Sequence, residues 1–295
     1  MRTRRTRGFG RPEDRGAGGL SVGAATSSVD PMKQYHLDLD QAAVGGARIA
    51  VLPGDPFRVP RLAAALDPGA AELAFHREFR TWRADVAGVP VLVTSTGIGG
   101  PSTAIAIEEL AALGVDTLIR VGTTGAIQSR VALGDLVVVT GAVRLDGASA
   151  HYAPLAYPAV SDHAVVGALL ASGAGGTEGG CHAGVVVSSD TFYPGQERYE
   201  SHAGYVIRDL QGTREEWTRL GCLAYEMEAA TLLTVSGVLG LRAGCVLGVV
   251  AHRLHSERVD PQVVQEAETA AIQCAAHAVR ALVGAGRGPQ TATGD

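Results

Sequence analysis

The segment SSDTFYPGQERY (residues 188–199) brings together three side chains that suit a flat, polar heterocycle. Phe192 offers an aromatic face, Gln196 an amide that donates and accepts, and Arg198 a planar fork of N–H donors. A ring with alternating carbonyl and N–H edges, such as uracil, would match all three. The alternative is a surface loop in which a Pro-Gly turn carries solvated polar residues.

A glycine-containing joint at residues 52–58, LPGDPFR, could hold an oxyanion. Gly54 lets the backbone approach an anion closely, and the helical pattern that begins at Pro56 would present free N–H groups. Arg58 falls near the first turn of that helix, where its guanidinium could reach the same anion. The alternative is a strand–turn–helix joint that uses Gly and Pro for their geometry alone.

A second candidate for anion binding is the arginine at the end of the apolar run 117–121. Arg120 needs a partner there, because an unpaired buried charge is very costly. The Gly-Thr-Thr-Gly that follows, which includes Thr123, supplies N–H groups and hydroxyls that could bind the same oxyanion. The alternative partner is a carboxylate such as Asp116. We favour an anion, phosphate in particular.

A third Gly-rich turn, TGIGGPS at residues 96–102, approaches the GxGxxG pattern of dinucleotide-binding folds. The pattern fails at its last position, where Ser102 stands, and the strand before it is not at the start of the chain. We therefore expect backbone that lies close to a ligand or to another subunit. A nicotinamide-dependent dehydrogenase remains as an alternative.

Two carboxylates in YEMEAAT (residues 225–231) are candidates for binding a sugar. A carboxylate can accept two hydrogen bonds from a vicinal diol, and Met227 offers a soft apolar surface to a sugar ring. We expect only Glu228 to point into the site, because Glu226 is too close in sequence to point the same way. The alternative is that both acids simply favour the start of a helix through its dipole.

The composition is that of a globular protein with a sizeable core. The chain has 295 residues, of which 46% are hydrophobic, and its net charge of -5 gives no reason to expect nucleic acid as a partner. No apolar run approaches the roughly 20 residues that span a membrane. The four cysteines show no metal-binding spacing, so we expect buried thiols in a reducing cytoplasm: Cys181, Cys222, Cys245 and Cys274.

Strand-like apolar runs alternate with helical patterns along the chain. The strands are expected at 48–52, 89–94, 117–121, 136–140, 182–187 and 244–250. The helices are expected at 56–66, 101–113, 161–171, 226–238 and 261–283. This alternation predicts a single α/β domain in which a central mixed β-sheet is flanked by helices.

The two ends of the chain differ from the middle. Residues 1–31 are rich in Arg and Gly and poor in large apolar residues, so we expect a disordered N-terminal extension. An alternative is that Met32 is the true start of the protein. Residues 32–286 are expected to form one domain, and residues 287–295 a disordered C-terminal tail.

Several segments together resemble the nucleoside phosphorylase family, in the branch that acts on uridine. They are PGDPFRV, HREFRTWRA, TSTGIGGPSTAIAIEELAALG, RVGTTGAIQ, VRLDGAS, SSDTFYPGQERY and YEMEAATLL. The resemblance implies reversible phosphorolysis of uridine to uracil and ribose 1-phosphate, with inorganic phosphate as co-substrate and no required cofactor. It also implies a homohexamer built from dimers, with active sites shared between subunits.

The same resemblance assigns roles residue by residue. Phosphate would be bound by Gly54, Arg58, Arg77, Arg120 and Thr123. The ribose would be held by His36, Thr123, Met227 and Glu228. The base would meet Phe192, Gln196, Arg198 and Arg253. The catalytic residues would be Arg120, Gln196, Arg198 and Glu228. A monovalent cation such as K⁺ would lie between subunits, near Glu78, Ile98 and Ser102.

Two of these residues would act across the dimer interface. Arg77 would reach the phosphate of the neighbouring subunit, and His36 the 5′-hydroxyl of its ribose. The alternatives are that His36 is an ordinary surface or core histidine and that Arg77 pairs with Glu78 or another exposed carboxylate.

The preference for a pyrimidine is argued from a missing carboxylate. Purine-specific members of the family place an Asp after the late strand to protonate the base, whereas here no carboxylate comes before Glu257. Ala251 and His252 depart from the family pattern, which leaves open whether thymidine or 2′-deoxyuridine is accepted. The alternatives are a broader pyrimidine or purine nucleoside phosphorylase, a hydrolytic nucleosidase, and a nucleoside-binding paralogue without turnover.

Overall fold

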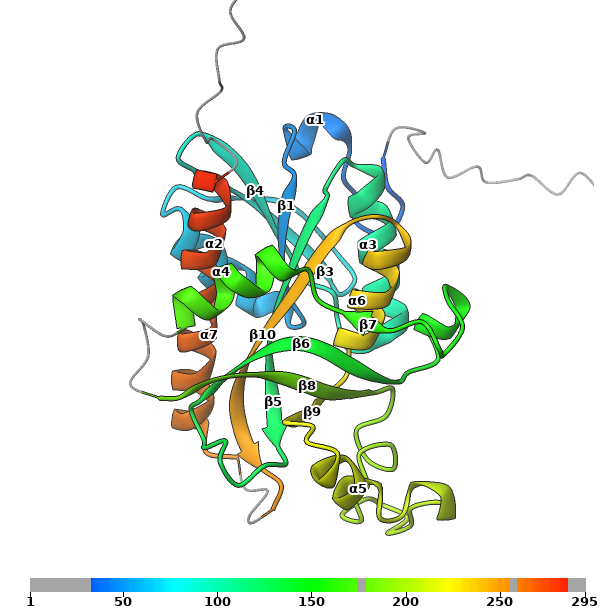
Figure 1. Cartoon of the computed structure of the whole chain (residues 1–295). Helices are drawn as coiled ribbons and strands as arrows, with labels where there is room; N and C mark the ends of the chain where they lie inside the picture. Colours follow the sequence, from blue (N-terminus) through cyan, green and yellow to red (C-terminus); the bar gives the residue numbers. More distant parts are fainter. Residues whose placement is uncertain (1–32, 174–178, 255–258, 286–295) are drawn as a thin grey trace, which may run out of the picture. The chain divides into compact units, whose positions relative to one another are not determined.

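A computed structural model describes residues 33–173, 179–254 and 259–285 (Figure 1). The predicted N-terminal extension, the alternative start at Met32, the C-terminal tail and Glu257 lie outside these residues. The strands are β1 (Ile49–Pro53), β2 (Ala71–His76), β3 (Phe79–Val86), β4 (Val89–Thr94), β5 (Thr117–Ala126), β6 (Leu136–Leu145), β7 (Ala159–Val160), β8 (Cys181–Ser189), β9 (Ala224–Glu226) and β10 (Arg242–His252). The α-helices are α1 (Gln41–Val44), α2 (Val59–Leu66), α3 (Gly100–Ala112), α4 (His163–Gly173), α5 (Thr213–Arg219), α6 (Ala229–Val238) and α7 (Pro261–Ala285). Short 3₁₀ turns are η1 (Pro56–Arg58), η2 (Ser149–His151) and η3 (Arg208–Leu210).

The strands of the described residues form one mixed sheet, part of which closes on itself. β5 pairs in parallel with both β1 and β10, and its last residues pair antiparallel with β9. From β10 the order continues through β6 and β8 and returns to β9. β5, β10, β6, β8 and β9 therefore make a closed circuit, which β1, β4, β3 and β2 extend as an open sheet. The predicted α/β domain with a mixed sheet and flanking helices is confirmed.

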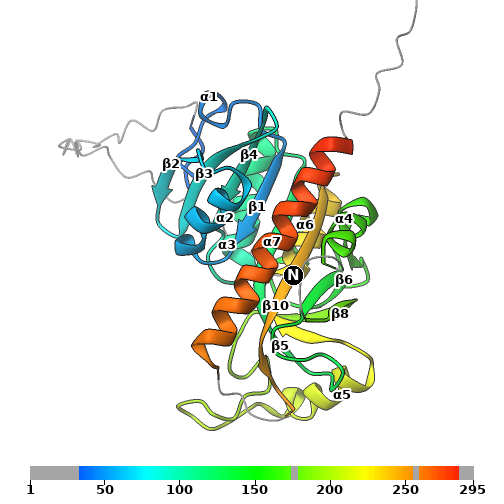
Figure 2. The same ribbon diagram turned by 90° about the vertical axis from the view of Figure 1, so that its left-hand side faces the viewer.

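Helices cover both faces of the strands, so that a strand such as β1 is buried on both sides. Ala50 and Leu52 belong to the core shared with α3 and α6, whereas Ile49 and Val51 belong to the core shared with α2, α4 and α7. Figure 1 shows these two groups of helices on opposite sides of the strands, and Figure 2 shows α7 running the length of β10. Among the helices that the structure describes, none has the length and apolar character needed to cross a bilayer.

Two predicted strands are longer than expected, which changes the setting of Arg120. The strands predicted at 117–121 and 136–140 continue to Ala126 and Leu145, because β10 and β8 go on pairing with them. Arg120 therefore lies within β5 rather than at its end. The Gly-Thr-Thr-Gly that follows is paired strand and not a turn.

The start of two predicted helices is also corrected. The helix predicted at 226–238 begins at Ala229, since Glu226 ends strand β9 and Glu228 is the residue that precedes the first turn. The helix predicted at 56–66 opens with the 3₁₀ turn η1, where the Asp55 side chain accepts a hydrogen bond from the N–H of Phe57.

The hairpin of β2 and β3 and the helix α5 were not expected from the sequence. β2 lies at the outer end of the open sheet and is largely exposed, so it lacks the continuous apolar run that marks a buried strand. The turn of this hairpin places Arg77 in the left-handed region, with a φ of 55°. The hairpin thus presents Arg77 at its tip.

Replacing Gly248 by alanine should destabilise the protein by about 2 kcal/mol or more. A Cβ at this position of β10 would lie 2.5 Å from the carbonyl oxygen of Ala267 in α7, and a helix backbone cannot easily retreat. Gly167→Ala on α4 is the matched control, because a Cβ there meets nothing within 4 Å. Urea unfolding of both variants would measure the effect. A Gly248→Ala variant as stable as the Gly167→Ala control would show that α7 can shift away from β10.

Candidate active site

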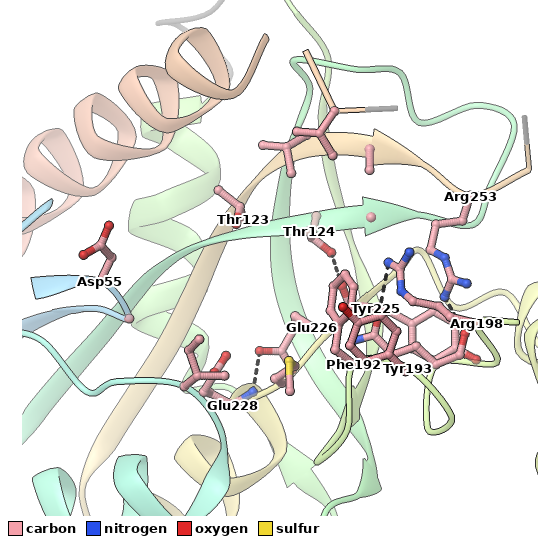
Figure 3. Close-up of a pocket in the computed structure, with 18 of the residues that line it drawn as sticks. Asp55, Thr123, Thr124, Phe192, Tyr193, Arg198, Tyr225, Glu226, Glu228 and Arg253 are labelled. Atoms are coloured by element: carbon pink, nitrogen blue, oxygen red, sulfur yellow. Dashed lines mark hydrogen bonds between the residues drawn. The ribbon is translucent and has the colours of Figure 1, made fainter. Parts of the chain in front are cut away.

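A cavity of about 1320 Å³ lies where β1, β5 and β10 end and where β9 leads into α6 (Figure 3). The turn between β2 and β3, the turn after β4, the loop after β8, the helix α5 and the segment before α7 also contribute to its wall. Because neighbouring parallel strands end at the same edge of a sheet, side chains far apart in sequence converge there. The topology therefore creates a single place for the predicted site residues to meet.

Most of the predicted site residues line this cavity. They are Gly54, Arg58, Glu78, Ile98, Arg120, Thr123, Phe192, Gln196, Arg198, Met227, Glu228 and Arg253. Three predicted residues are not part of its wall: His36, Arg77 and Ser102. The structure thus brings together the anion, sugar and base candidates of one chain and separates from them the two residues assigned to a neighbouring subunit.

Arg120 is one of the buried arginines of the cavity wall, and its partners are carboxylates of the same chain. Its Nη2 contacts the Glu228 carboxylate, and its Nε lies 3.3 Å from Glu226. Asp116, the predicted alternative partner, pairs with other arginines instead. The buried Nη1 finds no hydrogen-bond partner in the described part of the chain, and it lies beside Gly54. That nitrogen is a donor available to an anion.

Burial and charge act in opposite directions on this cluster. Burial disfavours the charge on Arg120, but the nearby Glu228 and Glu226 outweigh it and hold the pKa of Arg120 above its ordinary value. Burial raises the pKa of Glu226, against the attraction of Arg120. The cluster therefore has a fixed positive charge and a carboxyl group that burial biases toward protonation.

The expectation that only Glu228 faces the site is wrong, because Glu226 and Glu228 both reach Arg120. The chain turns from β9 into α6 between them, so neither strand nor helix periodicity applies. Glu226 also accepts hydrogen bonds from the Ser188 hydroxyl and from the N–H groups of Glu228 and Ala229. Those contacts fix Glu226 as the anchor of the turn.

The third Gly-rich turn approaches the site through its backbone. The N–H of Gly99 donates a hydrogen bond of 2.6 Å to Glu228, and Gly97 and Gly99 both have positive φ values, 71° and 91°. These conformations suit glycine and little else. Glu228 is therefore held between a backbone donor and Arg120.

Arg58 lines the cavity but is already engaged by a carboxylate from α7. Its Nη2 lies 2.6 Å from Glu268, which also pairs with Arg61 at 3.0 Å. The buried Nε of Arg58 has no hydrogen-bond partner within the described residues. Glu268 was not foreseen from the sequence, since an acid on an amphipathic helix usually marks a solvated face.

The base candidates form a second cluster at the far end of the cavity (Figure 3). Arg253 is almost fully buried and donates a hydrogen bond of 2.6 Å from its Nη1 to the carbonyl of Gln196. The guanidinium of Arg198 lies 4.0 Å from the centre of the Phe192 ring and covers one of its faces. A base that stacks on Phe192 would use the other face or displace Arg198.

Two residues of this cluster were missed by the sequence analysis. Tyr225 lines the cavity, and burial raises its pKa to about 12, so it is a neutral wall under ordinary conditions. Arg214, on α5, also lines the cavity and donates a hydrogen bond of 2.9 Å to the carbonyl of Arg253. The predicted fold lacked α5, so nothing in the sequence placed Arg214 here.

The residues predicted to act across an interface lie together on the outer surface. His36 is held by Glu109, whose carboxylate lies 2.6 Å from its Nδ1. The guanidinium of Arg77 lies 5.7 Å from the ring of Tyr35, rather than in an ion pair with Glu78. A contact of 3.1 Å between His76 and the carbonyl of His36 joins the two segments. Their action on a neighbouring subunit stays a prediction.

Of the residues predicted for a monovalent cation, Glu78 and Ile98 line the cavity, and Ser102 contacts Glu78 from outside its wall. The Ser102 hydroxyl lies 3.0 Å from a carboxylate oxygen of Glu78 and also contacts the carbonyl of Thr96. The side chain of Ile98 is exposed. These oxygens are the hard ligands that alkali cations prefer, so the donor set fits the prediction.

The fold and the cavity have counterparts in known enzymes. The chain belongs to the phosphorylase superfamily, whose family model matches residues 48–284. It is 50% identical to uridine phosphorylase of Escherichia coli over 84% of this chain and 98% of that protein. It is 47% identical to uridine phosphorylase of Thermococcus kodakarensis over 80% of this chain and 83% of that protein. Guanosine phosphorylase of Halorubrum lacusprofundi is 38% identical over 74% of this chain and 83% of that protein. The predicted family is confirmed.

Proposed function

We propose that the protein is a pentosyltransferase that converts uridine and phosphate reversibly into uracil and ribose 1-phosphate. The observation that carries this proposal is the order of groups along one cavity: a buried arginine with a free donor, two carboxylates, then a polar loop suited to a flat base. Two relatives that bear the name uridine phosphorylase, at 50% and 47% identity, support uridine as the nucleoside.

Phosphate would bind beside Gly54, where Nη1 of Arg120 points. An incoming anion competes with Glu228 for the same guanidinium, so Glu228 would turn toward the ribose hydroxyls as phosphate binds. Arg58 adds a second donor through its Nε, while its Nη2 stays with Glu268. Binding therefore exchanges one anionic partner of Arg120 for another and does not leave the charge unpaired.

The sugar and base would lie between these two clusters. As the N-glycosidic bond lengthens, the ribosyl group gains positive charge, which the phosphate beneath C1′ stabilises before it bonds to that carbon. Negative charge moves onto the uracil, where Arg198 and Gln196 can donate hydrogen bonds to a carbonyl oxygen. Holding phosphate and nucleoside face to face supplies much of the remaining acceleration.

The proposal is tested by measuring uracil release from uridine with and without inorganic phosphate, with thymidine and inosine in parallel. We expect phosphate-dependent release from uridine, formation of ribose 1-phosphate and no turnover of inosine. Release without phosphate would identify a nucleosidase. Turnover of inosine alone would overturn the assignment of the base to Gln196 and Arg198. Turnover of thymidine would show that the site accepts a 5-methyl group on the base and a sugar without a 2′-hydroxyl.

We also propose that two subunits share each site and that the protein is a homohexamer. The observation in support is that His36 and Arg77 lie outside the cavity wall, on a surface that a neighbour could cover. Arg77→Ala and Arg120→Ala should each be inactive alone. After random mixing of equal amounts, about a quarter of wild-type activity should return, because half of the dimers carry one intact site. No recovery would count against a shared site.

Three further proposals concern the cellular location of the protein and its need for an ion or a cofactor. We propose that it acts in the cytoplasm, which is supported by the four cysteines, none of which forms a disulfide. We propose that K⁺ binds near Glu78 and Ser102 between subunits, which the paired oxygens of these residues support. Inorganic phosphate is the co-substrate, and we propose that turnover requires no organic cofactor.

A further inference from the structure

Glu197 stands between the two residues assigned to the edge of the base, yet it does not line the cavity. Gln196 and Arg198 are buried and face the cavity, whereas the carboxylate of Glu197 faces helix α5. One of its oxygens accepts a hydrogen bond of 2.6 Å from the N–H of Gly212, and the other accepts one of 2.7 Å from the N–H of Arg214. Both carboxylate oxygens are thus engaged by the first turn of α5, and one of them also accepts a hydrogen bond of 3.2 Å from the Tyr199 hydroxyl.

The backbone of Glu197 is in a conformation that favours glycine. Its φ is 51°, and a non-glycine residue in this left-handed region costs roughly 1 kcal/mol or more. The conformation sends the Glu197 side chain away from the cavity while its two neighbours point in. A glycine would adopt this conformation more easily but could not make the hydrogen bonds of the carboxylate, which offset the energetic cost of the strained backbone.

The hydrogen bonds of Glu197 belong to a closed ring around the base loop, the segment of residues 190–199 that follows β8. The carboxylate of Glu197 holds the N–H of Arg214, and the guanidinium of Arg214 donates to the carbonyl of Arg253. The guanidinium of Arg253 in turn donates to the carbonyl of Gln196, the residue next to Glu197. The ring joins the loop after β8, the helix α5 and the end of β10.

We infer that Glu197 is a positioning residue for base recognition, which acts by fixing Gln196 and Arg198 through helix α5. The inference rests on the proposed function, because it concerns the base end of the same site. Glu197 makes no contact with the anion cluster around Arg120, which lies at the other end of the cavity. Loss of its carboxylate should therefore weaken the binding of the nucleoside and leave the binding of phosphate unchanged.

Three variants test this inference. Glu197→Gln keeps the shape of the side chain but leaves a single acceptor oxygen, and Glu197→Gly relaxes the backbone but removes the hydrogen bonds to α5 and to Tyr199. Glu215→Gln is the matched control, since Glu215 is an exposed acid on the same helix that pairs with Arg219 across one turn. KM for uridine and KM for phosphate are measured separately for each, together with kcat and the melting temperature.

We expect the KM for uridine to rise about tenfold in Glu197→Gln and more in Glu197→Gly, with the KM for phosphate changed less than about twofold. Glu215→Gln should match the wild type. Equal kinetics of all three variants would overturn the inference, and so would an equal rise of both KM values, which indicates a general loss of structure. If Glu197→Gly does not fold, the KM values of Glu197→Gln alone test the inference.

Failure of the proposed function is recognised separately, in the wild-type protein. If the wild type releases no uracil with phosphate, that function is wrong whatever the variants do. Calorimetric binding of uracil in the presence of phosphate then compares the wild type with Glu197→Gln without any turnover. Equal uracil affinity in the two, or no binding to either, would overturn the role of Glu197 as well.

Discussion

Replacing Arg120 by alanine should lower kcat/KM for uridine by about a thousandfold. The guanidinium is a buried cation beside Glu226 and Glu228, and its free Nη1 is the donor that the proposed phosphate would take. The same change leaves Glu226 and Glu228 buried without their cation, which we expect to cost about 3 kcal/mol of stability. Steady-state kinetics and thermal unfolding measure the two effects on one variant.

The stability loss of Arg120→Ala should depend on pH in a defined direction. Burial already raises the pKa of Glu226 above its ordinary 4.5, so the folded chain holds this proton more tightly than the unfolded chain. Such a group stabilises the fold below the unfolded pKa, and that stability is lost as pH rises through the folded pKa. Without Arg120 the effect grows, so the difference in melting temperature from wild type should widen from about pH 5 to about pH 8.

The control for this prediction is Arg48→Ala. Arg48 is exposed and pairs with Asp116 on the surface, so its loss removes the same charge without touching the cavity. Wild-type activity in Arg48→Ala and loss of activity in Arg120→Ala would place the effect in the site. If the difference in melting temperature between the wild type and Arg120→Ala became smaller at high pH, Arg120 would not be the group that compensates the buried charge of Glu226.

Replacing Arg198 by alanine should lower kcat for uridine by about a hundredfold while the KM for phosphate stays nearly constant. Arg198 is buried at the base end of the cavity and is the cation that would meet negative charge developing on the leaving uracil. Its guanidinium is held over the Phe192 ring and beside the amide of Gln196, so little reorganisation is needed during the reaction. Only the transition state, and not phosphate binding, should lose stabilisation.

A nucleoside with a more acidic leaving group tests the charge on the base directly. 5-Fluorouracil leaves as an anion more readily than uracil, so 5-fluorouridine depends less on Arg198. We expect Arg198→Ala to lose several-fold less activity with 5-fluorouridine than with uridine. Equal losses with both substrates would mean that Arg198 positions the base and does not stabilise its charge. Arg219→Ala, on the exposed face of α5, serves as the control.

The base loop could be predicted from sequence because its residues are neighbours in the chain. Phe192, Gln196 and Arg198 belong to one segment, and their chemistry is visible without knowledge of the fold. Arg214 and Glu197 could not be assigned in the same way. Their roles depend on α5 docking against the loop, which is a tertiary contact with no local sequence pattern.

The residues around Arg120 could also be predicted only in part from the sequence. Gly54 and Arg120 were found from Gly-rich turns and from a charge in an apolar run, and the structure places them side by side. The pairing of Arg120 with both acids was missed, because it depends on β9 pairing with the end of β5. The spacing rules that predict which side chains share a face apply within one strand or one helix. Glu226 and Glu228 lie on either side of the junction between strand β9 and helix α6, so no such rule applies to them.

The closed circuit of strands cannot be completed until a late stage of the protein's synthesis. β10 occupies the place between β5 and β6, yet it is synthesised after both. Until it emerges from the ribosome, the two older strands each have an unpaired edge, and Arg253 is missing from the base end of the cavity. A growing chain is therefore open to wrong strand pairing between the synthesis of β6 and that of β10, and we expect fragments that end in this interval, before residue 242, to aggregate.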